Sequence, residues 1–232
     1  MNLLAIDTAT TGCSAAYQEG GRILAHRAAA MARGQSESLM PMIADVLADA
    51  GRAYGDLQAL AVTVGPGAFT GMRIGLAAAR GLALALAIPV IGVTTLEALA
   101  HGVPEAKRRD AVVLAVLDSK RADVYAQAFA DDGAPLTEPA ALHEEDLIAV
   151  ARQVAGNGDV LLVGDVEQRV LELLLNQGVA VRSAGAPTVP DAAVVAAIAA
   201  GRGLPDKADA PAPLYLRPPD ATIPTNGGRL RP

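Results

Sequence analysis

The order of the apolar runs in the first 93 residues limits the fold more than any other feature of this chain. Three short runs, separated by tight turns, have the length and composition of β-strands; they cover residues 3–7, 13–18 and 23–28. The Gly20-Gly21 pair between the second and third runs is typical of a hairpin turn. These residues therefore predict three neighbouring antiparallel strands.

The next 60 residues change to a different pattern. Apolar residues recur at helical spacing over 36–50, with Ser36 as the expected N-cap, and a continuous apolar run at 60–64 predicts a buried central strand. A second helix at 70–87 and a strand at 89–93 follow. The predicted order is three antiparallel strands and then two further strands, each preceded by a helix. This order is typical of the ribonuclease-H-like, actin-like architecture.

A similar unit begins again in the second half. An apolar strand ends in Asp118 there, as the first strand ends in Asp7. The predicted elements of this half are strands at 112–117, 124–130 and 160–163, and helices at 144–154, 166–176 and 191–200. We therefore predict an α/β fold made of a duplicated actin-like unit, with mixed sheets flanked by helices.

The joint between the two units is expected within 102–110, a polar stretch that contains Pro104. We expect an N-terminal actin-like domain at 1–104, which carries the partner interface, and a smaller degenerate domain at 105–216, whose last helix can pack back on the first domain. Residues 217–232 are rich in Pro and Gly and predict a flexible tail.

Composition excludes several classes of function. The 232 residues carry a net charge of −6 and only 3% aromatic residues, with no Trp, which argues against autonomous nucleic-acid binding although a local basic patch remains open. The single Cys13 excludes an internal disulfide and a multi-cysteine zinc site. The first residues do not have the pattern of a signal peptide, and Arg80 and Pro89 interrupt the most apolar segment, so we expect a cytoplasmic protein without a membrane span.

The turn after the first strand is one candidate site. Asp7 ends an apolar strand and the small polar residues Thr8, Thr10 and Thr11 follow it, as in a nucleotide pocket where a carboxylate orients a metal-bound water and the turn meets phosphates. The alternative is that these side chains only satisfy backbone groups in the turn.

The loop before the second helix is another candidate. Gly65, Pro66 and Gly67 lead to the helix at Thr70, and a glycine-rich loop before a helix N-terminus suits an anion. The sequence lacks the Gly-Lys-Ser/Thr of a P-loop. The alternative is a tight strand-to-helix turn in which Thr70 caps the helix and Arg73 reaches back to a carboxylate.

Searches for catalytic machinery identify no catalytic residue and no metal site. The three histidines are scattered, and no G-x-S-x-G nucleophile motif is present. The second helix instead carries small residues four apart, at 71, 75 and 79 and at 77, 81 and 85, which permit close approach of another helix from this chain or from a second subunit.

Five segments together closely resemble the TsaB (YeaZ) family: LLAIDTATTGCSAA, QSESLMPMI, AVTVGPGAFTGMRIGLAAARGLA, PVIGVTTLEALA and PLYLR. The resemblance is dense over 2–99 and resumes at 118–125 and 213–217. The family often has His where this chain has Gln35, and Arg where it has Lys120, and the second change loses the planar fork of a guanidinium.

The resemblance implies a function without catalysis. TsaB is similar to TsaD, which transfers the threonylcarbamoyl group onto the adenosine beside the anticodon of tRNA, and the metal-binding His-x-x-x-His of TsaD falls on Thr95 and Leu99 here. The implied partners are a TsaD-like transferase and a TsaE-like ATPase, with tRNA contacted only through the complex. No cofactor is expected, although ATP or ADP is possible at the complex interface.

The resemblance also implies that the first two helices form the partner interface. We expect its residues to be Leu39, Met40, Ile43, Gly71, Gly75 and Ala78, and a Gly75→Arg variant to fold but to lose the complex. The same helices could pair two copies of this chain when it is alone. The alternatives are a nucleotide-binding ATPase or small-molecule kinase of the actin-like superfamily, and a glycoprotease, which would need a metal or a nucleophile-base pair.

Overall fold

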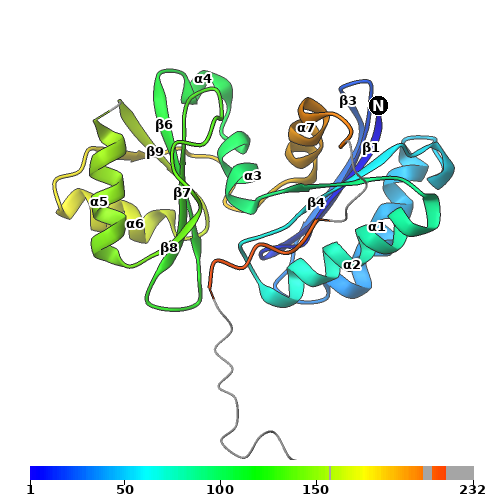
Figure 1. Ribbon diagram of the computed structural model, residues 1–232, viewed down its shortest axis with the longest axis horizontal. Helices are drawn as coiled ribbons and strands as arrows, with labels where there is room; N and C mark the ends of the chain where they lie inside the picture. The colour runs from blue at the N-terminus through cyan, green and yellow to red at the C-terminus, as the bar shows by residue number, and fades with distance from the viewer. Residues whose placement is uncertain (157, 206–210, 218–232) are drawn as a thin grey trace, which may run out of the picture.

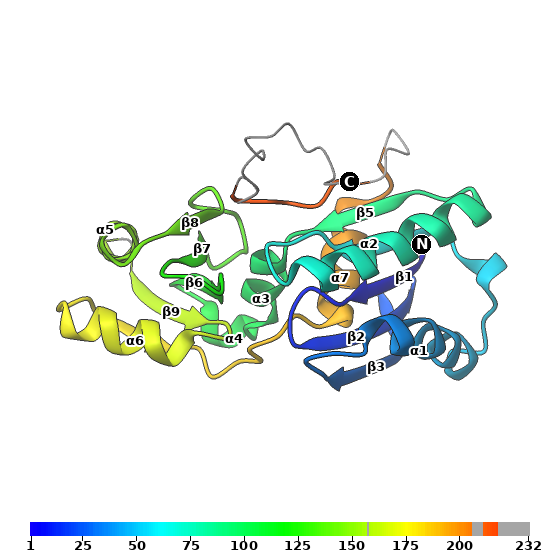
Figure 2. The same cartoon turned by 90° about the horizontal axis from the view of Figure 1, so that it is seen from below.

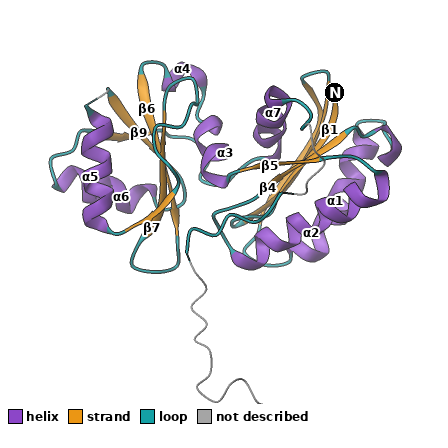
Figure 3. Cartoon of the chain, in the orientation of Figure 1, coloured by secondary structure: helices purple, strands orange, loops and turns teal. Residues whose placement is uncertain are grey.

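The computed structural model describes residues 1–156, 158–205 and 211–217, which form two lobes, each built on one five-stranded sheet (Figure 1). The predicted α/β class is confirmed, since helices and strands alternate along most of the chain (Figure 3).

The first lobe contains the N-terminal sheet. Its strands lie in the order β3-β2-β1-β4-β5 and are β1 (Asn2–Asp7), β2 (Gly12–Glu19), β3 (Arg22–Ala30), β4 (Ala59–Thr63) and β5 (Val90–Val93). The first three strands are antiparallel, while β4 pairs parallel with β1 and β5 parallel with β4. Helices α1 (Gln35–Asp49) and α2 (Phe69–Leu86) cover one face of this sheet (Figure 2), and the fold predicted for this half is confirmed.

The second lobe repeats this topology. Its order is β10-β9-β6-β7-β8, with β6 (Ala111–Asp118), β7 (Val124–Phe129), β8 (Ala140–Leu142), β9 (Asp159–Val163) and β10 (Val181–Ser183). Thus β6 corresponds to β1 at the centre, β7 and β8 to the antiparallel strands, and β9 and β10 to the parallel ones. Helices α5 (Glu144–Ala155) and α6 (Glu167–Asn176) accompany this sheet, so the predicted duplication is confirmed.

Three helices lie where the two lobes meet: α3 (Thr95–Gly102), α4 (Glu105–Arg108) and α7 (Ala192–Arg202). Leu96 and Leu99 of α3, which the sequence patterns did not predict as a helix, pack with Val113 and Phe129 of the second sheet. The last helix, α7, packs on β1, β2, β4 and β5 of the first sheet, on the face opposite α1 and α2 (Figure 1).

Both long helices of the first lobe begin differently from the prediction. The N-cap of α1 is Gly34, whose φ of 95° is in the left-handed region, and Ser36 lies inside the helix. The N-cap of α2 is Ala68, so Thr70 is not a cap. Among the side chains that the structure describes, none accepts a hydrogen bond from the first-turn N–H groups of either helix.

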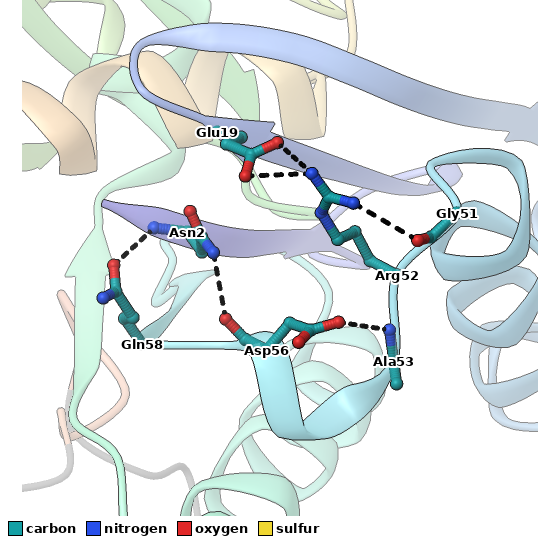
Figure 4. A network of polar contacts seen from close by, with 7 residues as sticks. All are labelled: Asn2, Glu19, Gly51, Arg52, Ala53, Asp56 and Gln58. Carbon is teal, nitrogen blue, oxygen red and sulfur yellow. Dashed lines mark hydrogen bonds and ion pairs between the residues drawn. The ribbon is translucent and has the colours of Figure 1, made fainter.

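A polar network fixes the far end of the first sheet (Figure 4). Arg52 donates two hydrogen bonds to the carboxylate of Glu19, at 2.8 and 3.1 Å. The backbone N–H of Asn2 donates to Gln58, and the Asn2 side chain donates to the carbonyl of Asp56. The network ties the ends of β1 and β2 to the 3-10 turn η1 (Tyr54–Asp56) that leads into β4.

Among the described residues, α2 is the helix long and apolar enough to cross a membrane. It packs on β4, β1 and α1 in the structure, and Met72, Leu76 and Ala79 on its inner side are buried. The length and composition of α2 are therefore accounted for by its place in the first lobe.

The end of the described chain is ordered rather than free. Residues 211–217 lie against the first lobe, and Arg217 forms an ion pair with Asp123 of the second lobe. Arg217, the first residue of the expected flexible tail, thus has a buried carboxylate as its partner. The rest of that expected tail, residues 218–232, lies outside the described residues.

Candidate functional site: the cleft between the lobes

A cleft of about 870 Å³ separates the two lobes. The first lobe lines it with the turn after β1, the start of α1 and the loop before α2, and the second lobe lines it with the turn after β6. The polar and charged residues of its wall are Thr10, Thr11, Arg33, Gln35, Ser36, Thr70, Asp118, Ser119, Lys120, Arg121, Tyr125 and Asp165.

Asp7 does not line this cleft. Its side chain is 0% exposed, and Oδ1 accepts hydrogen bonds from the Thr63 hydroxyl at 2.6 Å and from the Ala9 N–H at 3.1 Å, while Oδ2 has no partner. Burial raises the pKa of Asp7 to about 6, against the lowering effect of these two hydrogen bonds. Asp7 thus accepts one hydrogen bond from its own turn, at Ala9, and one from Thr63 at the end of β4.

The turn after Asp7 is closed by the glycines of the next loop. The Thr8 hydroxyl donates to the carbonyl of Gly71 at 2.7 Å. A Cβ at Gly71 would collide with the Thr8 carbonyl oxygen, and a Cβ at Gly67 with the Ala9 carbonyl oxygen. These glycines are therefore needed because two backbone segments of this chain meet there.

Thr10 and Thr11 are the predicted pocket residues that do reach the cleft. Thr11 is exposed, while Thr10 is only 8% exposed and its hydroxyl has no partner. The first turns of α1 and α2 line the same cavity, and the N-termini of these helices, which no described side chain caps, give this wall a partial positive charge.

The rest of the predicted glycine-rich loop is mainly structural. Gly65 has a φ of 106° and is packed between Met72 and the carbonyl of Leu214, and Pro66 is buried. Arg73 does not reach back to a carboxylate: its Nε donates to the Tyr215 hydroxyl at 3.0 Å and its guanidinium lies 3.7 Å from the centre of the Phe69 ring.

The second lobe contributes a charged wall. Lys120 Nζ lies 2.7 Å from Asp118 Oδ2, and the Asp118 N–H donates to Asp165 Oδ1 at 2.8 Å. Two effects act on the pKa of Asp118. Burial raises it, while the hydrogen bonds and the charge of Lys120 together lower it by more, so the pKa lies below its usual value. Sequence patterns did not identify Arg33, Tyr125 and Asp165, which approach the cleft only through folding.

Four of the six predicted interface residues lie inside the chain. Leu39 and Ile43 are 1% and 0% exposed and belong to the first-lobe core. Gly71 and Gly75 are buried, and a Cβ at Gly75 would lie 2.7 Å from the Thr8 hydroxyl. An arginine at this buried position would have to displace Thr8 and Val62, so the structure does not favour the expectation that Gly75→Arg leaves the fold intact.

The outward sides of the same two helices carry exposed apolar residues beside charged ones such as Asp45 and Arg80. Met40 is 41% exposed and Leu84 86% exposed, while Ala78, the sixth predicted residue, is half-buried against the core. We define the α1–α2 face as the exposed small and apolar residues on the outward sides of the two helices. They are Met40, Ala44 and Ala48 of α1 and Ala77, Gly81, Leu84 and Ala85 of α2. The residues of each helix recur at helical spacing, so each set lies on one side of its helix.

The described residues contain no group of three His, Cys, Asp or Glu side chains placed to hold a metal ion. Thr95 and Leu99 lie one turn apart on α3 and are 0% and 1% exposed. The Leu99 side chain packs in the apolar core of the second lobe.

The repeated sheet topology and the cleft between the two lobes define the class of this protein as actin-like. A likeness of fold alone extends to component A of the (R)-2-hydroxyglutaryl-CoA dehydratase of Acidaminococcus fermentans, with a TM-score of 0.50 at 16% identity over 87% of this chain and 98% of that chain.

More specific similarities narrow the class. The family model described as "TsaD: tRNA N6-adenosine threonylcarbamoyltransferase" matches residues 22–168. The tRNA threonylcarbamoyladenosine biosynthesis protein TsaB of Escherichia coli is 42% identical over 127 residues, 54% of this chain and 53% of that protein, so the match spans about half of its length. The crystal structure of an uncharacterized Pseudomonas aeruginosa protein with similarity to peptidase YEAZ superposes with a TM-score of 0.76 at 31% identity, over 93% of this chain and 99% of that chain. The chain belongs to the TsaB (YeaZ) family.

Proposed function

We propose that this chain is a non-catalytic scaffold subunit in the biosynthesis of threonylcarbamoyladenosine in tRNA. It binds a TsaD-like transferase and with it a TsaE-like ATPase, and it contacts tRNA only through that complex in the cytoplasm. Membership of the TsaB family supports the pathway, and the net charge of −6 supports an indirect contact with RNA.

The α1–α2 face is the observation that carries the partner-binding role. It places two exposed large apolar side chains, Met40 and Leu84, beside alanines and a glycine, with the exposed Arg80 one turn from Leu84. A partner helix can approach the small residues closely and bury this apolar surface. The TsaD-type family model covers both helices of this chain, which supports a partner with an equivalent pair of helices. The pairing would then resemble that of two similar subunits about a pseudo-two-fold axis.

Two features support the absence of catalysis. Leu99 stands at one position of the metal-binding pair that the resemblance to TsaD identifies, and its aliphatic side chain is buried in the second-lobe core. The strand-ending carboxylate of Asp7 is closed off by the contact between Thr8 and Gly71 and does not line the cleft. These contacts support a non-catalytic role for both positions.

A nucleotide in the cleft is the second candidate. Thr10 offers an unpartnered hydroxyl beside the N-termini of two helices, which suits a phosphate. A kinase or ATPase would also need a carboxylate that reaches the bound phosphates. This cleft offers Asp118, which is half-buried and paired with Lys120, and Asp165, which accepts a hydrogen bond from the Asp118 N–H. Nucleotide binding without turnover is compatible with the scaffold role.

The test uses Leu84→Arg with Leu175→Arg as the matched control. Both leucines are exposed on helices, at 86% and 51%, but Leu175 lies on α6 in the second lobe. We expect Leu84→Arg to weaken binding to the TsaD-like transferase at least about tenfold, because it places a charge in an apolar contact, and Leu175→Arg to bind as the wild type. Titration calorimetry and the yield of modified tRNA in the reconstituted system measure both.

Wild-type affinity for Leu84→Arg would reject the α1–α2 face as the partner surface. Modified tRNA formed at full yield without this chain would reject the scaffold role. ATP turnover by the isolated chain well above background would favour the ATPase or kinase instead. If sedimentation shows that Leu84→Arg disrupts only a homodimer, the face pairs two copies of this chain and not the transferase.

A further inference from the structure

The segment Pro211–Arg217 joins the two lobes after the last helix. It runs along the edge of the first lobe near β4 and β5 and ends beside the second lobe (Figure 1). We call this segment the strap. It contains PLYLR, one of the five segments that resemble the TsaB family, and the proposed function gives this segment no role.

The strap is anchored to the first lobe at several points. The Leu214 N–H donates to the carbonyl of Val64 at 2.7 Å, directly after β4, and the Leu214 side chain packs on the first-lobe core. Arg80 of α2 donates to the carbonyl of Pro211 at 2.8 Å. Tyr215 receives a hydrogen bond from Arg73 and lies 5.8 Å from the Phe69 ring, centre to centre.

At the second lobe, among the described residues, the strap is held by the ion pair of Arg217 with Asp123. Asp123 is only 2% exposed, and its other oxygen accepts a hydrogen bond from the Ser119 hydroxyl at 2.5 Å. A buried carboxylate that loses its cationic partner is strongly disfavoured, so Asp123 holds the end of the strap in place.

The other connections between the lobes lie elsewhere. The chain first crosses through α3 and α4, and crosses back through residues 184–191, and Lys107 ties these two crossings together with hydrogen bonds to the carbonyls of Ala184 and Gly185. Figure 1 shows α3 and α4 above the strap, so the lobes are joined at two separate levels. If the lobes rotate about the connection formed by α3 and α4, the cleft opens or closes. Such a rotation requires the strap to move or to detach from one lobe.

We propose that the strap is a latch that fixes the spacing of the two lobes, and that the Arg217–Asp123 ion pair is its releasable end. Among the residues that the structure describes, the first-lobe end has several anchors and the second-lobe end has the ion pair of Arg217, so loss of that ion pair frees the second-lobe end. The latch also accounts for two motifs at once, because Asp123 lies in the segment 118–125 and Arg217 ends PLYLR.

Arg217→Gln tests the latch, because it removes the charge and keeps most of the side-chain length. Arg217→Lys is the conservative rescue. Arg182→Ala is the matched control, since Arg182 pairs with Asp159 within the second lobe, at 3.7 Å, and crosses no lobe boundary. Thermal unfolding of each variant establishes that the lobes remain folded.

Two readouts follow the two ends of the latch. Hydrogen exchange of the Leu214 amide reports on the strap, and we expect it to become at least about tenfold faster in Arg217→Gln. Spin labels at Ala77→Cys on α2 and Glu145→Cys on α5 report on the lobe spacing, and we expect their distance distribution to broaden. Burial raises the pKa of the Cys13 thiol to about 11, so the native cysteine does not compete for the label.

The latch is supported if both readouts change in Arg217→Gln, largely recover in Arg217→Lys and stay at wild-type values in Arg182→Ala. A folded Arg217→Gln variant with wild-type exchange and spacing would overturn it. Faster exchange at Leu214 with an unchanged distance distribution would also overturn it, because the strap would then not govern the spacing of the lobes. Neither readout depends on the transferase, so the result is independent of the proposed scaffold function.

Discussion

Asp7 and Asp118 end the central strands β1 and β6 of the two lobes and occupy equivalent places in the duplicated topology. Asp7 is fully buried and its pKa is raised to about 6, whereas the Asp118 side chain is 26% exposed, pairs with Lys120 and has a lowered pKa. The pKa of an aspartate at this topological position can therefore be raised or lowered, and the loops packed around the aspartate determine the direction.

The difference arises in the turns that follow the two strands. In the first lobe Gly67 and Gly71 let the next loop touch the backbone after Asp7, and this contact excludes solvent from the carboxylate. In the second lobe the turn after Asp118 stays at the wall of the cleft and supplies Lys120 as a charged partner. An aspartate at the end of a strand is thus not by itself evidence of a catalytic carboxylate.

The largest expected effect comes from opening the sealed turn. Gly71→Ala places a Cβ against the Thr8 carbonyl oxygen, and because both groups are close to rigid backbone we expect the free energy of unfolding to fall by about 4 kcal/mol. Gly81→Ala on the same helix is the control, since a Cβ there meets nothing within 4 Å and should stabilise the helix by about 1 kcal/mol. Urea denaturation measures the free energy of unfolding of both variants. Equal values for Gly71→Ala and Gly81→Ala would show that the backbone contact after Asp7 has room for a Cβ.

Asp7→Asn should change the pH dependence of stability. The folded pKa of about 6 lies above the unfolded value of 3.8, so the stability associated with Asp7 is fully present below pH 3.8 and is lost as the pH rises through 6. This loss is about 3 kcal/mol, and the stability of the variant relative to the wild type should rise by that amount between pH 3.5 and 7. A difference in the free energy of unfolding that is the same at every pH would mean that folding does not raise the pKa of Asp7.

Asp118→Asn should have the smallest effect and the opposite sign of pH dependence. The lowered pKa means that its contribution is present above its usual pKa and is lost as the pH falls through the folded value. Because Lys120 is 78% exposed, we expect a loss of about 0.5 kcal/mol at neutral pH. A double-mutant cycle with Lys120→Ala checks the assignment, and additive effects of the two changes would remove the ion pair from the explanation.

Local patterns were enough to predict most of the fold. Apolar runs such as those of β4 and β9 are short, continuous and bounded by glycine, so they could be assigned without tertiary information. The three-residue strands β8 and β10 were missed because their residues are partly exposed and carry no clear alternation. Helix α3 was missed because the segment after β5 was assigned to no element, and its helical character is clearest from Leu96 and Leu99, which pack on the other lobe.

The site was harder to predict than the fold. Thr10 and Thr11 were correctly placed at a cavity wall, but Arg33 and Asp165 lie 132 residues apart in the sequence and meet at the cleft only through folding. The spacing of Gly71 and Gly75 correctly indicated a close approach, yet it could not say that the neighbour is the Thr8 turn of the same chain. A small residue on a helix has the same pattern whether it faces its own backbone or a partner.

The position of α7 has a consequence for synthesis on the ribosome. Val195, Ala196 and Ala199 of this helix cover the sheet face formed by residues such as Leu3 and Ala61, so the first lobe is discontinuous in sequence. The first 93 residues, which form the whole first sheet, leave the ribosome well before α7 and hold that apolar face uncovered while the second lobe is made. A shortened protein that ends after β5 would keep this face exposed permanently, and apolar surface of this kind promotes aggregation.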